Sequence, residues 1–90
     1  MKSLRLPAVK SVFGYSSDGA VYLNIDAGLL PKPVKIGPRA SAWPEVEIEQ
    51  ILTARAGGAT DDQIRALVNK LHDARKAAWV ALQDAMGVAA

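Results

Sequence analysis

The fold of this chain is decided by one short stretch, PKPVKIGPRASAW, at residues 31–43. Its first two prolines keep the backbone extended. Apolar and basic residues then alternate through VKI, a Gly-Pro-Arg turn follows, and alternation resumes up to Trp43. This pattern predicts a small β-hairpin with Arg39 at its tip and Lys35 on its flank. We expect Trp43 to pack in the core, as a single tryptophan at a strand end usually does.

Two short helices are predicted before this hairpin. Residues 6–13 carry a proline at the first helical position, which suits its fixed φ, and Gly14 follows as a C-terminal stop. The second helix begins with Ser17 as its N-cap and ends at Gly28, because glycine readily adopts the left-handed conformation. Two short helices joined by a tight turn form a helix-turn-helix pattern.

Two further helices are predicted after the hairpin. Pro44 opens a glutamate-rich helix that ends at Gly57-Gly58. A long helix then runs from about Thr60, in a capping box with Gln63, to Met86. Its apolar residues fall within one stripe: Ile64, Leu67, Val68, Leu71, Ala78, Trp79, Leu82 and Met86. Such a helix is on the order of 40 Å long. Because the rest of the chain is too small to cover it, we expect its last part to contact a second molecule.

The composition limits the class of protein. The chain has 90 residues, enough for one domain, and 50% of them are hydrophobic. It has no cysteine and one histidine, His72, so we expect no metal site, no cofactor and a solvated His72. No nucleophile–base set and no phosphate-binding glycine loop occur, which argues against an enzyme and against a small-molecule substrate. With no apolar run of bilayer length and no signal-like N-terminus, we expect a cytoplasmic protein that does not bind membranes.

The charge of the chain is unevenly distributed. The net charge is +2, but residues 1–43 carry six bases and two acids, a net of +4. This asymmetry favours an anionic partner for the N-terminal half.

Part of the sequence also resembles a known family. The residues that carry the resemblance are Gly28–Ala40 (GLLPKPVKIGPRA), Trp43-Pro44-Glu45 and Val46-Glu47. They are similar to the AlpA-like family of small DNA-binding proteins encoded by phages and mobile elements, and the resemblance extends over residues 4 to about 55. It implies a winged helix-turn-helix, in which the hairpin is the wing.

The expected fold class is therefore mainly α with a small β-hairpin. We expect a winged helix-turn-helix DNA-binding domain at residues 1–56. Residues 57–90 contain the long C-terminal amphipathic helix, which we expect to serve in packing and self-association.

The resemblance also implies a function. The family includes excisionases, or recombination directionality factors, several copies of which bind repeated sites beside an attachment site and bend the DNA. A partner tyrosine integrase then excises the mobile element. We therefore expect a sequence-selective architectural protein of the bacterial nucleoid that binds double-stranded DNA cooperatively with itself. The alternatives are a transcription activator acting at a promoter and, less expected, a protein-interaction module whose long helix binds another protein.

Candidate contact residues follow from the sequence together with this resemblance. In the second helix, Asp18 can accept a hydrogen bond from cytosine, and Tyr22 can reach a phosphate or a thymine methyl group. Arg39 can enter the minor groove, and nearby lysines can bind phosphates. The expected DNA-binding residues are Ser17, Asp18, Gly19, Tyr22, Lys32, Lys35 and Arg39. The expected self-association residues are Trp79, Val80, Leu82 and Met86.

The second helix departs from the family pattern. Many members carry Arg or Ser at its start and a basic residue after the tyrosine, where this chain has Asp18, Gly19 and Leu23. We therefore expect specificity to depend more on the wing and on DNA shape than on this helix.

Overall fold

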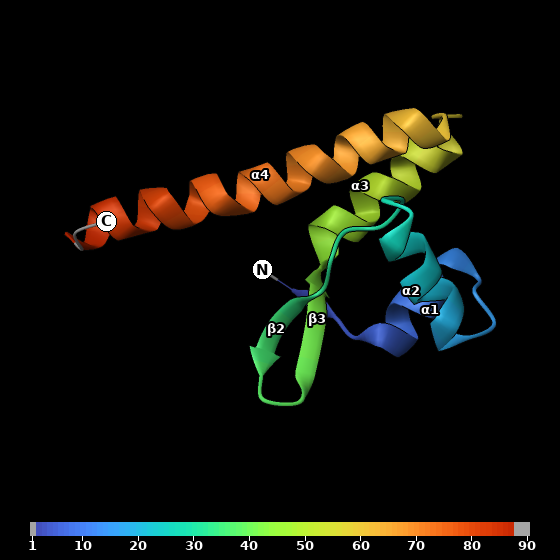
Figure 1. Cartoon of the computed structure of the whole chain (residues 1–90), viewed down its shortest axis with the longest axis horizontal. Helices are drawn as coiled ribbons and strands as arrows, with labels where there is room; N and C mark the ends of the chain where they lie inside the picture. Colours follow the sequence, from blue (N-terminus) through green and yellow to red (C-terminus); the bar gives the residue numbers. More distant parts are fainter. Residues whose placement is uncertain (1, 88–90) are drawn as a thin grey trace.

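The computed structural model describes residues 2–87 and confirms a mainly helical fold with a small β-hairpin and a long last helix (Figure 1). The elements in chain order are β1 (Ser3–Leu4), α1 (Leu6–Phe13), α2 (Asp18–Asp26), β2 (Val34–Gly37), β3 (Ala40–Pro44), α3 (Glu45–Ala56) and α4 (Asp61–Met86). The strands form one antiparallel sheet in the order β1-β3-β2. The predicted hairpin is therefore present, with a third strand added to it.

Strand β1 has no counterpart among the predicted elements. Ser3 pairs with Pro44 and Leu4 pairs with Trp43, and the amide of Glu45 donates a hydrogen bond to the carbonyl oxygen of Lys2 at 3.0 Å. Two residues are too few to show the alternation that marks a strand in sequence. The strand forms because β3 offers an unpaired edge, and it attaches the start of α1 to the sheet.

The predicted ends of the first two helices are confirmed. Gly14 adopts φ 70° after α1, and the Ser17 side chain accepts a hydrogen bond from the amide of Ala20 at 3.2 Å at the start of α2. After α2, Gly28 adopts φ 78° and the amide of Leu29 reaches back to the carbonyl of Asn24 at 2.8 Å. These caps satisfy backbone groups that would otherwise be left unpaired at the helix ends.

One core joins both parts of the chain. It contains Val9, Val21, Leu30, Trp43, Ile48, Ile51, Ile64, Val68 and Leu71. Trp43 lies in this core as predicted, and its indole N–H donates to the carbonyl of Pro31 at 2.7 Å. Because the first half of α4 contributes three of these side chains, it packs as part of the same hydrophobic core as the hairpin and the short helices.

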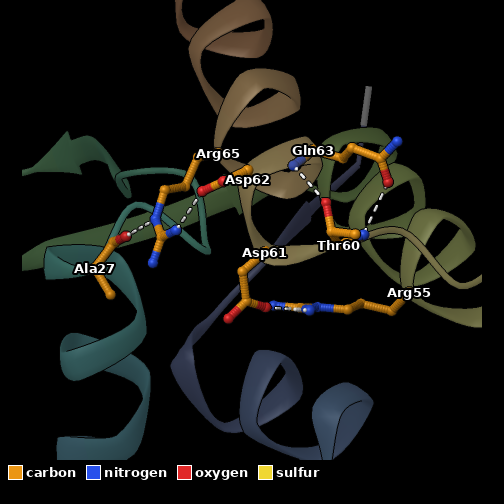
Figure 2. Close-up of polar contacts among 7 residues, drawn as sticks. All are labelled: Ala27, Arg55, Thr60, Asp61, Asp62, Gln63 and Arg65. Carbon is orange, nitrogen blue, oxygen red and sulfur yellow. Dashed lines mark hydrogen bonds and ion pairs between the residues drawn. The ribbon is translucent and has the colours of Figure 1, made fainter.

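The first turn of α4 is attached to both α2 and α3 (Figure 2). Thr60 and Gln63 form the predicted capping box, with bonds of 3.2 Å and 2.9 Å between side chains and amides. Arg65 donates to the carbonyl of Ala27 at the end of α2 at 2.9 Å. Arg55 of α3 pairs with Asp61 at 2.8 Å, and this hydrogen bond holds the pKa of the Asp61 carboxyl below its ordinary value. These contacts fix the direction in which α4 leaves the body.

A second anchor holds α4 farther along its length. Glu47 of α3 is buried, and the Arg75 guanidinium donates to both of its carboxylate oxygens, with Nε at 2.8 Å from Oε2. The same Arg75 also donates to the carbonyl of Lys32 at 2.8 Å. Beyond this point α4 continues away from the sheet and the short helices (Figure 1).

Candidate nucleic-acid interface

A groove between the helix-turn-helix and the hairpin gathers basic and polar side chains. It has a volume of about 430 Å³. Its lining residues are Arg5, Leu6, Pro7, Tyr22, Arg39 and Ser41. Within residues 2–87, neither Arg5 nor Arg39 forms a salt bridge. Two guanidinium groups beside a tyrosine and a serine hydroxyl therefore make the groove suitable for a phosphate backbone.

One cation of the hairpin lines this groove, and a second lies on the same face of the hairpin as a groove residue. Arg39 lies in the turn between β2 and β3 and lines the groove directly. Lys35 pairs with Ser41 across the two strands. Because paired residues of antiparallel strands project from the same face, Lys35 shares the face of Ser41. The hairpin thus contributes both of its predicted contacts to one side of the molecule.

Helix α2 reaches the groove through Tyr22, whereas the predicted contacts at its start are partly used within the chain. The Ser17 hydroxyl caps the helix, and the Asp18 carboxylate pairs with Lys10 of α1 at 2.9 Å. Gly19 is exposed, and its lack of a side chain leaves room for close approach of a ligand. Tyr22 lies one turn after Asp18, is half exposed, and lines the groove. Lys10 balances the Asp18 charge, which would otherwise repel phosphates.

Lys32 lies apart from the other predicted contacts. It lines a different hollow, of about 270 Å³, together with His72, Arg75 and Lys76 of α4. Its amide donates to His72 and its carbonyl accepts from Arg75. The structure thus brings Tyr22, Lys35 and Arg39 to one side and assigns Lys32 to a second cluster, which we call the α4 basic cluster (Lys32, His72, Arg75 and Lys76).

The expectation that His72 is solvated is wrong. The Nε2 atom of His72 accepts a hydrogen bond from the Lys32 amide at 3.0 Å, and the side chain is half-buried. Burial and the nearby Arg75 charge lower the pKa of His72 and keep the ring neutral, as an accepting Nε2 requires. The position of His72 in the helical sequence predicts only which side of α4 it occupies. In the fold, the segment around Lys32 that precedes β2 covers that side of α4. Residues 2–87 contain no group of three or more potential metal ligands.

Arg5 is the groove residue that sequence reasoning missed. It precedes α1 at the N-cap position, where its side chain makes no capping hydrogen bond. A basic residue just before a proline-initiated helix was the available signal, because the N-terminus of a helix favours anions and the arginine adds a positive charge there. What places it opposite Arg39 is the pairing of β1 with β3, which no local pattern predicts.

The predicted self-association residues lie on the projecting half of α4. Trp79, Val80, Leu82 and Met86 are between 53% and 56% exposed. Trp79 therefore does not fold back onto the body. Val80 lies on the opposite side of the helix from Leu82, since the two are separated by 200° at 100° per residue. No helix in the described part of the chain is long and apolar enough to cross a membrane.

A helix-turn-helix whose second helix shares a basic groove with a β-hairpin defines a winged helix-turn-helix protein. The model of the AlpA family, described as the prophage CP4-57 regulatory protein, matches residues 2–56, more than half of the chain. The chain therefore belongs to the AlpA family and is a phage-type regulatory DNA-binding protein, and this family is not one of enzymes. No curated protein and no solved structure matches it.

Proposed function

We propose that this protein is an excisionase. Several copies bind repeated sites beside an attachment site of a mobile element in the bacterial cytoplasm and bend the DNA there. A tyrosine integrase then acts on the bent DNA in the direction of excision. The protein itself carries out no covalent chemistry, since its contribution is to change the shape of the DNA.

The observation that carries this proposal is the groove shared by Tyr22, Arg5 and Arg39. In our proposal α2 lies in the major groove and the wing reaches the adjacent minor groove, where Arg39 meets its negative potential. Lys35 binds a phosphate. The proposed contacts on α2 are Ser17, Asp18, Gly19 and Tyr22.

Binding by a single copy is expected to be weak. A few cations near the groove limit the number of phosphates that one copy neutralises. Cooperative assembly on adjacent sites compensates for this weakness. The exposed residues Trp79, Val80, Leu82 and Met86 support self-association, because large apolar side chains on the projecting half of a helix are costly to leave in water.

Fluorescence anisotropy with duplexes tiled across the attachment region tests DNA binding. We expect Arg39→Ala to weaken binding about 10-fold or more, in keeping with about 1–3 kcal/mol for a specific arginine contact. Lys70→Ala removes the same charge from an exposed position of α4 and serves as the matched control. If Arg39→Ala binds like the parent protein, the long helix rather than the groove carries the function, as a protein-interaction module would require.

An excision assay with the integrase supplied distinguishes the two DNA-binding roles. The description of the family as a regulatory protein favours transcription activation as the second candidate. An excisionase increases formation of the excised circle from an integrated element. A chain that activates a promoter reporter while leaving excision unchanged is a transcription activator.

A further inference from the structure

The projecting half of α4 continues the same face that the first half buries. Ile64, Val68 and Leu71 pack in the core, and at 100° per residue Leu82 falls on the same side of the helix, with Met86 beside it. In the first half α3 covers this face, whereas Leu82 and Met86 are exposed by 53% and 56%. The uncovered face is thus a direct extension of a packing surface.

The position of α3 restricts how a second copy could cover this face. If two α4 helices paired in parallel, the partner's first half would enter the space that α3 occupies. In an antiparallel pair, each body lies beyond the end of the other helix, and only the projecting halves overlap. A pair centred between residues 79 and 80 overlaps over residues 72–87, roughly 22 Å at 1.5 Å per residue.

This arrangement places apolar side chains against an apolar hollow. A hollow of about 240 Å³ lies between α3 and α4 where α4 leaves the body. Its lining includes Val46, Leu71, Ala74 and Ala78. In the antiparallel register, residues 72–78 stand level with residues 81–87 of the second copy. Leu82 of the second copy therefore lies at the level of this hollow.

The charges of the two regions that meet are complementary. The last turn of α4 has no basic residue, and the C-terminal end of a helix carries a partial negative charge. In the same register, Gly87 of one copy stands level with His72 of the other. Within the α4 basic cluster, His72 is neutral and Arg75 is paired with Glu47. Lys32 and Lys76 of the first copy therefore supply the positive charge near the negative end of the second copy's helix.

We propose that α4 pairs antiparallel with α4 of a second copy of this chain. The pair covers Trp79, Leu82 and Met86 and sets the negative end of each helix against the α4 basic cluster of the other copy. This inference rests on the self-association in the proposed function and adds its geometry. It also assigns Lys32 to a contact between copies. An overlap of this length buries less surface than the roughly 1,200–2,000 Å² of a stable interface. The pairing is therefore weak in free protein and is strengthened when DNA holds two copies together.

Cysteine cross-linking of the full chain tests the geometry, because the natural sequence has no cysteine. Ala74→Cys and Ala85→Cys stand level in the antiparallel pair, so an oxidised mixture of the two variants should form the mixed disulfide. Each variant alone should form about 10-fold less, since like positions are then more than 7 Å apart. Ala78→Cys lies near the centre and should cross-link to itself, whereas its neighbour Ala77→Cys points away from the face and is the matched control.

The outcome is read without DNA at high protein concentration. Self-cross-linking of Ala74→Cys and of Ala85→Cys in place of the mixed product indicates a parallel pair and overturns the proposal. Equal cross-linking of Ala78→Cys and Ala77→Cys indicates random collision and also overturns it. Adding Arg39→Ala to the cysteine variants should leave the cross-links unchanged, so a failure of DNA binding is distinguishable from a failure of pairing. Lys76→Glu should reduce the mixed product.

Discussion

The pair of Glu47 and Arg75 gives the sharpest prediction for stability. Glu47 is 7% exposed, Arg75 is 25% exposed, and the guanidinium contacts both carboxylate oxygens. Arg75→Met keeps the apolar stem and removes the charge, so that a carboxylate remains buried without its partner. Breaking a buried ion pair in this way costs about 3–5 kcal/mol.

The partial exposure of Arg75 lowers the expected cost of breaking the pair. Because Arg75 lies at the edge of the body and water reaches part of the guanidinium, we expect a loss of about 2–3 kcal/mol in the free energy of unfolding. For a chain of this size that corresponds to a fall in Tm of roughly 10 °C or more. The double variant Glu47→Met with Arg75→Met should recover most of the loss, because two apolar side chains leave no charge unpaired.

Urea denaturation followed by circular dichroism measures these changes. The control is Arg55→Met, which breaks a more exposed pair with Asp61 and should have only a small effect. If Arg75→Met costs no more than Arg55→Met, or if the double variant is no better than Arg75→Met alone, the reasoning from burial is refuted.

Three further predictions concern single positions. The pKa of His72 is lowered in the folded chain, so the unfolded chain binds a proton at a higher pH than the folded chain does. Stability should therefore decline as the pH falls below about 6.5. His72→Gln should flatten this dependence in thermal melts recorded over a range of pH. Thr60→Ala removes one half of the capping box and should cost about 1 kcal/mol in urea denaturation; an unchanged midpoint would mean that water replaces the cap. Arg5→Ala should weaken DNA binding without changing the melting curve. In anisotropy measurements over a range of salt concentrations, it should reduce the slope of log affinity against log salt by about 1. An unchanged slope would exclude a phosphate contact.

Local signals were sufficient to predict most of the fold. The caps at Ser17 and Thr60 and the positive-φ positions at Gly14 and Gly28 depend on interactions within a few residues of each helix end, which sequence displays directly. The hairpin was recognisable for the same reason. Strand β1 was not, because its two residues acquire their structure from β3 alone.

The candidate interface was predictable only in part. Tyr22, Lys35 and Arg39 lie on one side of the molecule because neighbouring elements carry them. The α4 basic cluster joins residues about 40 positions apart in sequence, and no periodicity within one element indicates such an approach. In the sequence Glu47 is likewise an ordinary acidic residue at a helix start, and only the fold brings Arg75 beside it.

The division of α4 has a genetic consequence. Its buried side chains all precede Arg75, so a nonsense mutation just after Lys76 would leave the hydrophobic core, the anchoring ion pair and the basic groove intact. Under the proposed function, the shortened product should still bind its DNA sites but should lack the surface through which copies associate. Such an allele would be dominant over the wild type in a cell that expresses both. The loss of function should increase with the number of copies of the truncated gene.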